Sequence, residues 1–270
     1  MRRSPTRKLS FIDAVRMRHR FWRYKNRSEW PALRFLFEYA KEGMTMCDVG
    51  ANLGIWSYFM SHLAGREGRV FAFEPQPELT SHLESLKASF DLQNLVICNS
   101  GLSTKPGRVS MSRKSPGSGD ARIVESTLEG RNTVEVEVTT LDDFLSEMPE
   151  VRIDLIKCDV EGHELDVFKG AEARLRSDRP ALIFEHHQSH AEKGEVFDFL
   201  LGLGYDGYFL QVDPLDHNRL LPRRRGRWLH YTEWSRQPYM KPGMTHRDYI
   251  FLRRGEQPEG FDAAHRHMGS

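Results

Sequence analysis

Short apolar runs and amphipathic stretches alternate along most of the chain. Met46, Cys47 and Val49 make an apolar run that stops at Gly50, which is typical of a buried strand. Residues 52–64 then carry apolar side chains at helical spacing. The same alternation predicts strands at residues 46–49, 69–73, 95–98, 152–159, 180–187, 205–210 and 248–252. Because these strands alternate with helical segments, we predict an α/β fold with a doubly wound, mostly parallel seven-stranded sheet and helices on both faces.

The chain divides into one domain with two extensions. At 270 residues a single substantial core is expected, and we assign it to residues 28–254. Residues 1–27 form a basic arm with ten Lys or Arg residues against one acid, Asp13, and residues 255–270 form a flexible tail. Two polar stretches, residues 104–132 and 212–243, are expected to be loop insertions.

Smaller features predict where several elements begin. Ser10, Ser28 and Thr140 each precede a helical pattern and are expected to cap a helix N-terminus. Residues 133–139 alternate apolar and polar side chains and predict a half-exposed strand that pairs with residues 109–111.

Residues 46–75 hold the first candidate site. The first strand runs into the turn GANLG at residues 50–54, and the next strand ends at Glu74. A glycine turn lets the backbone approach a ligand, and a carboxylate at the tip of the neighbouring strand can accept both hydroxyls of a ribose. The residues expected to bind a nucleoside cofactor are Asp48, Gly50, Asn52, Gly54 and Glu74.

Two of these residues discriminate between cofactors. Asn52 stands where the dinucleotide-binding pattern GxGxxG needs a glycine to admit the pyrophosphate. The carboxylate of Asp48 would repel a diphosphate, whereas it would attract the sulfonium or α-ammonium group of S-adenosylmethionine (SAM). The sequence therefore favours SAM over NAD and disfavours a dehydrogenase.

A second candidate site follows the fourth predicted strand, where Lys157, Asp159, Glu161 and His163 are close together. In a doubly wound sheet the first and fourth strands flank the topological switch point, so Asp159 is expected to face the reactive end of the cofactor. The alternative is that Glu161 or Glu164 only stabilises a helix N-terminus.

The fifth predicted strand also ends in ionisable residues, Glu185, His186 and His187. Together with Asp159 they could ligate a metal or supply a general base. Consecutive strand residues point to opposite faces, so at most Glu185 and His187 share a side. We therefore favour a site without a metal and retain His187 as a candidate base.

Three motifs in order, DVGANLG, FEP and IKCDVEGHEL, resemble those of the FkbM-type family of SAM-dependent methyltransferases. The resemblance covers residues 43–212. It implies a Rossmann-like methyltransferase fold with an antiparallel last strand, SAM as cofactor, and O-methylation of a hydroxyl on a sugar, polyketide or other small molecule. It also implies that Asn99 and Ser100, after the third strand, lie near the adenosine; a simple turn is the alternative there.

Methyl transfer to an alcohol requires a base within hydrogen-bond reach of the acceptor hydroxyl. We expect this base to come from Glu161, Asp159 and His187, with His163 behind them, and Asp159 also to bind the cofactor. The acceptor would be a small molecule, glycosyl or anionic. Residues 212–243, with an Arg-rich stretch at 223–227, either cover the acceptor or form a solvated loop.

Composition narrows the class of protein. Hydrophobic content of 39% and charged content of 29% are typical of a soluble globular protein, and a net charge of +1 shows no overall bias toward nucleic acid. No apolar run approaches the roughly 18 residues of a membrane span, and the N-terminus lacks a signal-peptide hydrophobic region. Cys47, Cys98 and Cys158 suit buried reduced thiols, so we expect a cytoplasmic protein; a homo-oligomer stays open.

The basic arm leaves further alternatives open. It could contact an anionic surface such as nucleic acid or lipid headgroups, pack its aromatic side chains on the domain or on a second subunit, or close over the substrate pocket. We favour packing, because charge alone does not read a nucleic-acid groove. Two other function classes are an RNA-directed methyltransferase that uses the arm and a SAM-binding protein without catalysis.

Overall fold

The computed structural model describes residues 8–119, 121–124, 132–185, 194–212, 226–231 and 248–261. Its helices are α1 (Phe11–Arg23), the π-helical turn η1 (Tyr24–Ser28), α2 (Trp30–Tyr39), α3 (Ile55–Ala64), α4 (Pro77–Phe90), α5 (Leu141–Phe144), α6 (Glu164–Lys169), α7 (Glu172–Ser177) and α9 (Glu195–Gly202). Its strands are β1 (Thr45–Val49), β2 (Arg69–Phe73), β3 (Leu95–Cys98), β4 (Gly101–Leu102), β5 (Gly107–Arg113), β6 (Arg122–Val124), β7 (Asn132–Thr139), β8 (Leu155–Cys158), β9 (Ala181–Glu185), β10 (Tyr205–Val212), β11 (Gly226–His230) and β12 (Asp248–Arg253).

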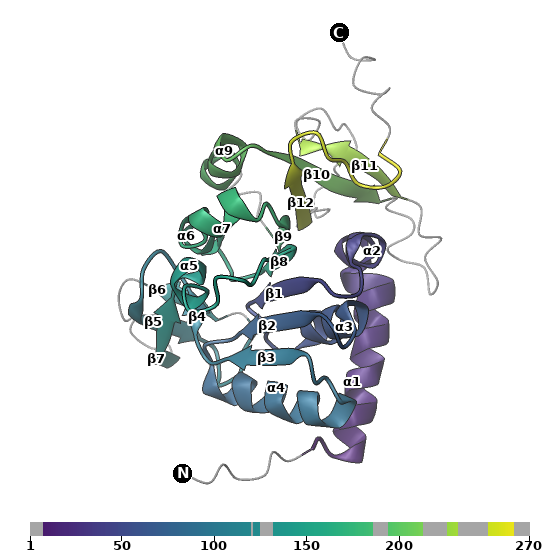
Figure 1. Ribbon diagram of the computed structural model, residues 1–270. Helices are drawn as coiled ribbons and strands as arrows, with labels where there is room; N and C mark the ends of the chain where they lie inside the picture. Colours follow the sequence, from purple (N-terminus) through teal and green to yellow (C-terminus); the bar gives the residue numbers. More distant parts are fainter. Residues whose placement is uncertain are drawn as a thin grey trace.

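The fold is organised around a sheet of eight described strands in the order β11-β10-β12-β9-β8-β1-β2-β3 (Figure 1). The strands from β9 to β3 in this order are parallel, whereas β12 is antiparallel to both β9 and β10. The predicted α/β fold and its antiparallel last strand are therefore confirmed. β1 lies between β2 and β8, which brings the ends of the two candidate-site strands together.

Helices cover both faces of this sheet. Helices α1 to α4 share one buried cluster with strand residues such as Met46, and α5, α6, α7 and α9 share the other with its neighbour Cys47. Successive strand residues point to opposite faces, so a strand covered on both sides needs apolar residues at nearly every position. The three cysteines are buried and free, as expected.

The eighth strand, β11, lies in a stretch that the sequence predicted to be a loop. It pairs antiparallel with β10 at the edge of the sheet. Trp228 and Leu229 are buried on opposite faces, and polar residues surround this short apolar pair in the sequence. The expected count of seven strands is therefore too low, because so short a run carries little periodicity.

A second sheet, in the order β4-β7-β5-β6, combines β5 and β6 of the other insertion with β4 and β7, which flank it in the sequence. The predicted pairing of residues 133–139 with 109–111 is confirmed, with Val109 opposite Val136. Thr140 caps α5 as predicted, because its hydroxyl accepts a hydrogen bond from the Asp143 N–H at 2.8 Å.

The N-terminal segment belongs to the core. The Ser10 hydroxyl accepts a hydrogen bond from the Asp13 N–H at 3.2 Å, which confirms the predicted cap of α1. Met17 and Phe21 are buried, and the Phe21 ring stacks on the Tyr58 ring of α3 with centroids 3.8 Å apart. The arm thus packs Phe21 and Tyr24 on the domain, the alternative that the sequence favoured, whereas Trp22 stays exposed.

Helix α2 begins later than predicted. The backbone continues from α1 through η1, so Ser28 lies inside helical backbone and Glu29 takes the N-cap position. The prediction that Ser28 caps this helix is wrong, because Ser28 is the last residue of η1 and Glu29 stands between it and α2. In the part of the chain that the structure describes, no helix is both long and apolar enough to cross a bilayer.

Candidate active site

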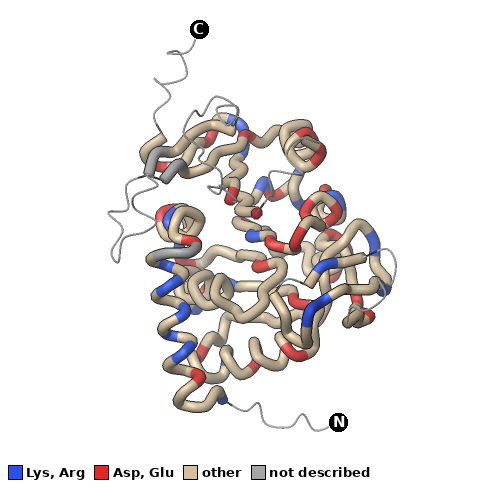
Figure 2. The backbone as a smooth tube through the Cα atoms, turned by 180° about the vertical axis from the view of Figure 1, so that it is seen from behind, with Lys and Arg blue, Asp and Glu red and all other residues tan. Residues whose placement is uncertain are grey.

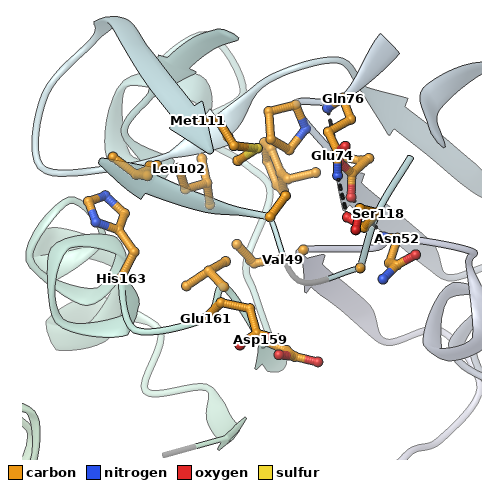
Figure 3. A pocket seen from close by; sticks show the side chains of 18 residues that line it. Val49, Asn52, Glu74, Gln76, Leu102, Met111, Ser118, Asp159, Glu161 and His163 are labelled. Carbon is orange, nitrogen blue, oxygen red and sulfur yellow. Dashed lines mark hydrogen bonds between the residues drawn. The ribbon is translucent and has the colours of Figure 1, made fainter. Parts of the chain in front are cut away.

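A cleft of about 560 Å³ lies at the carboxyl ends of β1, β2 and β8, under the small second sheet (Figure 3). It is lined by five parts of the chain: the turn after β1, the tip of β2, the chain at β4, the insertion around β5 and β6, and the turn after β8. Of the predicted site residues, the cleft lining includes Gly50, Asn52, Glu74, Asp159, Glu161 and His163. The topology therefore brings the two candidate sites into one cavity.

Two backbone N–H groups hold the Glu74 side chain in this cleft. Its Oε2 accepts a hydrogen bond from the Asn52 N–H at 2.9 Å, and its Oε1 accepts one from the Gln76 N–H at 2.9 Å. Burial raises the pKa of Glu74, and the two backbone hydrogen bonds oppose that shift. A carboxylate has about four lone-pair sites, so each oxygen keeps one acceptor position for a ligand hydroxyl.

Strained backbone surrounds the cleft. Asn52 has φ 49° and Glu161 has φ 55°, left-handed conformations that side chains other than glycine seldom adopt. Gly50 is also left-handed, with φ 77°, and a Cβ there would lie 2.0 Å from the carbonyl oxygen of Asp159. The ends of β1 and β8 can therefore approach only with glycine at position 50. Such strain often accompanies function.

Asp48 is buried beneath the cleft and does not line it. The Ser57 hydroxyl donates a hydrogen bond to its Oδ2 at 2.5 Å, and Lys157 Nζ lies 3.8 Å from its Oδ1. Burial raises the pKa of Asp48, and the Lys157 ammonium opposes the shift. The cation that this carboxylate meets is therefore Lys157, an ion pair that the sequence reasoning did not foresee.

Gly54 also lies outside the cleft lining. It precedes α3 with φ 76°, and a Cβ there would lie 2.5 Å from Leu86 and 2.7 Å from Leu83 of α4. Close packing of α3 against α4 accounts for this glycine without a ligand.

Lys157 joins the two strand ends electrostatically. Its Nζ lies 3.3 Å from Asp159 Oδ2, in addition to the contact with Asp48. Burial disfavours the Lys157 charge, but the carboxylates of Asp159, Asp48 and Glu29 outweigh that effect and raise the pKa of Lys157. Lys157 is thus a fixed positive charge that pairs with the Asp159 carboxylate at the cleft.

Glu29 is a carboxylate of this region that the sequence analysis missed. It accepts a hydrogen bond from the Trp56 indole N–H at 2.5 Å, and burial raises the pKa of Glu29 to about 7, with Lys157 opposing the shift. Burial likewise raises the pKa of Asp248, at the start of β12. No sequence signal marked Glu29, because Trp56 and Lys157 reach it only through packing of the N-terminal segment on the domain.

His163 has partners on both ring nitrogens. Nε2 lies 3.0 Å from the Ser103 hydroxyl and Nδ1 lies 3.1 Å from Asp166 Oδ2. Burial lowers the pKa of His163, and Asp166 opposes the shift. A neutral ring that donates a hydrogen bond from Nδ1 and accepts one at Nε2 satisfies both contacts. Neither nitrogen is then left to take a proton from a substrate hydroxyl.

The turn after β8 is held by Glu164. Its Oε1 accepts hydrogen bonds from the Val160 N–H at 3.3 Å and from the Gly162 N–H at 3.1 Å. Glu164 therefore takes the structural role considered for this stretch, whereas Glu161 is exposed at the cleft. In Figure 3 the Asp159 and Glu161 side chains lie together at one end of the view, away from Glu74 and Gln76.

Other predicted residues are placed elsewhere. The Asn99 side chain accepts a hydrogen bond from the Thr80 hydroxyl at 3.0 Å, and the cleft lining contains Gly101 and Leu102 instead of Asn99 and Ser100. His187 lies outside the described residues. Within the described ranges, no group of three or more His, Cys, Asp or Glu residues is arranged to hold a metal ion.

Several cleft residues gave no clear signal in the sequence. Met111 and Ile123 line the cleft from β5 and β6, and Ser118 from the turn between them. Gln76 Nε2 donates a hydrogen bond to the Ser118 carbonyl oxygen at 3.1 Å, which ties this turn to the tip of β2. The insertion at residues 104–132 thus contributes to the cleft, but its apolar members there could not be singled out from the sequence.

Comparisons with known proteins bear on this site. A family model described as "Methyltransferase FkbM domain" matches residues 48–206. The hexuronic acid methyltransferase AglP of Haloferax volcanii is 35% identical over 158 residues, which cover 58% of this chain and 62% of AglP. Methyltransferase 1 of Beauveria bassiana is 26% identical over 141 residues, which cover 46% of this chain and 56% of that protein. The chain thus spans less than two thirds of the length of these curated relatives.

Among solved structures, the methyltransferase FkbM from Methylobacillus flagellatus KT is similar to this chain with a TM-score of 0.48 and 17% sequence identity. The match covers 79% of this chain and 44% of that chain.

Proposed function

Because the chain belongs to the FkbM methyltransferase family, we propose that it transfers a methyl group from SAM to a hydroxyl of a small molecule. The observation that carries the proposal is the buried Glu74 carboxylate, oriented by the N–H groups of Asn52 and Gln76 with acceptor positions left on both oxygens. A carboxylate in this position can bind the two hydroxyls of a ribose.

The chemistry of the cleft suits the adenosine part of SAM. Val49, Leu102, Met111 and Ile123 supply apolar walls for a base, and Glu74 lies beside them for the sugar. Asp159, which pairs with Lys157 at 3.3 Å and lines the cleft, supplies a carboxylate for the cationic methionine part. When bound, SAM supplies an electrophilic methyl group on a sulfonium centre.

Glu161 is the residue that we propose as the general base. It is an exposed carboxylate in the cleft lining, on a left-handed backbone that the two hydrogen bonds to Glu164 keep in place. A carboxylate held in this way can take the proton of an acceptor hydroxyl as the oxygen becomes a nucleophile. Asp159, on the same turn, can orient that hydroxyl. His163 is a weaker candidate because both of its nitrogens are occupied.

The acceptor is proposed to be a sugar, including an acidic one. The support is the relative AglP, which its name describes as a hexuronic acid methyltransferase. We expect a hydroxyl on such a sugar to be the methylated group, since oxygen acceptors need the base that this cleft provides.

The test combines binding and turnover. S-adenosylhomocysteine is titrated calorimetrically into wild type and Glu161→Gln, and its release from SAM is then measured with a panel of glycosides and uronic acids. Binding that is retained in Glu161→Gln with turnover lowered by about 100-fold or more would support the assignment. Glu147→Gln, at an exposed carboxylate outside the cleft, is the matched control. Normal turnover in Glu161→Gln would exclude Glu161 as the base. If S-adenosylhomocysteine did not bind to wild type, the assignment of SAM as cofactor would be wrong.

A further inference from the structure

Helix α1 exposes an unusual set of apolar side chains. Among the described residues, the exposed large apolar side chains are Phe11 (82%), Ile12 (62%), Val15 (46%), Trp22 (46%) and Val96 (38%), and only the last lies outside α1. Such residues are common on surfaces when scattered singly. When they form a contiguous patch, as on this helix, they indicate a surface that interacts with another molecule.

The periodicity of α1 separates this apolar surface from the face that packs on the domain. Phe11, Val15 and Trp22 are four and seven residues apart, so they lie along one line of the helix with Ile12 beside them. Met17 and Phe21 point the other way and are buried in the core. The helix is therefore already held by one face, and the exposed side chains are not required for folding.

The same helix is strongly basic. Between residues 8 and 25 the charged residues are Lys8, Arg16, Arg18, Arg20, Arg23 and Lys25, opposed by the single acid Asp13. Arg16, Arg18 and Arg23 are exposed, and Figure 2 shows basic positions recurring along α1. An apolar strip flanked by arginines on an exposed helix is the arrangement by which proteins bind the surface of an anionic bilayer.

We propose that α1 docks this protein on an anionic lipid surface, with Phe11, Ile12, Val15 and Trp22 inserted at the level of the headgroups. The arginines flanking this strip attract the negative surface, and the apolar side chains are removed from water on binding. RNA would satisfy the arginines but would leave Ile12 and Val15, which cannot stack on bases, exposed to water. A second copy of the chain would bring the same basic residues against one another, so lipid is favoured over a dimer.

Docking through α1 would also affect the active site. The helix continues through η1 directly into Glu29, one of the carboxylates that surround Lys157. A docked α1 would therefore anchor the segment next to the carboxyl edge of the sheet. This inference goes beyond the proposed function and does not depend on it.

The experiment is co-sedimentation of the full chain with vesicles. One set contains phosphatidylcholine alone and the other an equal mixture of phosphatidylcholine and phosphatidylglycerol. We expect wild type to sediment with the anionic vesicles at low salt, and less as salt screens the attraction. Combined replacement Phe11→Ser and Trp22→Ser should weaken partitioning by at least about tenfold. The matched control is Val96→Ser, which removes an exposed apolar side chain from β3 and should bind like wild type.

Several outcomes would overturn the proposal. Two vesicle results would do so: wild type that binds neither vesicle, and a double variant that binds as well as wild type. Either result means that α1 is not a lipid-docking surface. Sedimentation velocity supplies the other decisive result: a stable dimer that the double variant dissociates would assign the surface to a second copy. Cofactor binding by the same variants is measured in parallel, because it should stay unchanged and shows that the domain is folded.

Discussion

Replacement of Glu74 by Gln isolates the proposed ribose contact with little change in shape. The carboxylate accepts hydrogen bonds from two backbone N–H groups, one on each oxygen. A Gln amide has one oxygen and one NH2 group, so one of these N–H groups would face another donor. The amide also offers fewer acceptor positions to the cofactor.

The expected loss falls on binding. A hydrogen bond to a charged group is worth about 1.5 to 3 kcal/mol, so loss of one such bond should weaken the affinity for S-adenosylhomocysteine by roughly 10- to 150-fold. Stability should change less, because burial raises the pKa of Glu74. An acid with a raised pKa destabilises the fold when it is ionised, above its unfolded pKa, and Gln avoids that cost.

Calorimetric titration at several pH values checks this reasoning. As the pH falls, protonation of Glu74 should weaken the binding of S-adenosylhomocysteine to wild type, beginning at a higher pH than for an ordinary glutamate because the pKa of Glu74 is raised. Glu74→Gln should lack this loss of affinity. Glu78→Gln is the control, because Glu78 pairs with Arg113 on the exposed side of α4. An affinity of Glu74→Gln within about threefold of wild type, in a folded protein, would refute the ribose assignment.

Three further substitutions test the structure. Glu29→Gln should equal wild type in stability below pH 4.5 and exceed it by roughly 3 kcal/mol above pH 7, because the ionising Glu29 destabilises wild type as the pH rises from the ordinary pKa of 4.5 through the folded pKa of about 7. Chemical denaturation at both pH values measures the free energy of unfolding of each protein, and equal values throughout would contradict this prediction. Gly50→Ala should lower the free energy of unfolding by at least about 2 kcal/mol, owing to its φ of 77° and the clash with the carbonyl oxygen of Asp159. Gly107→Ala, with open space around it, should be nearly neutral. Phe21→Ala should lower the free energy of unfolding by about 3 to 5 kcal/mol, because Phe21 is buried in the core, whereas Trp22→Ala, at an exposed residue, should lower it by less than about 1 kcal/mol. Similar melting temperatures for the two variants would show that α1 packs loosely.

Much of the candidate site could be predicted from the sequence. Gly50, Asn52 and Glu74 from the first stretch and Asp159 and Glu161 from the second all line one cleft. Such residues can be found because each lies in the turn that follows a strand, and the ends of parallel strands meet at one edge of a sheet.

Two other predicted residues lie outside the cleft lining, because their surroundings differ from what their position in the sequence indicated. Asp48 lies near the end of a strand, yet it is buried outside the cleft lining and pairs with Lys157 of the neighbouring strand β8. Gly54 belongs to the glycine turn but serves the packing of two helices. A linear pattern gives the place of a residue on its element, whereas the neighbour that its side chain meets depends on how the elements pack.

The sequence by itself determined the order of strands and helices, the parallel sheet and the strand ends that carry the chemistry. These are local properties, written in side-chain periodicity and in the residues that follow each strand. The tertiary structure alone decided that Glu29, from the N-terminal segment, comes to the Trp56 indole and the Lys157 charge, and that Ser103 and Asp166 engage both nitrogens of His163. Most of these contacts join residues far apart in the chain, so they exist only once the sheet order and the helix packing have placed them together.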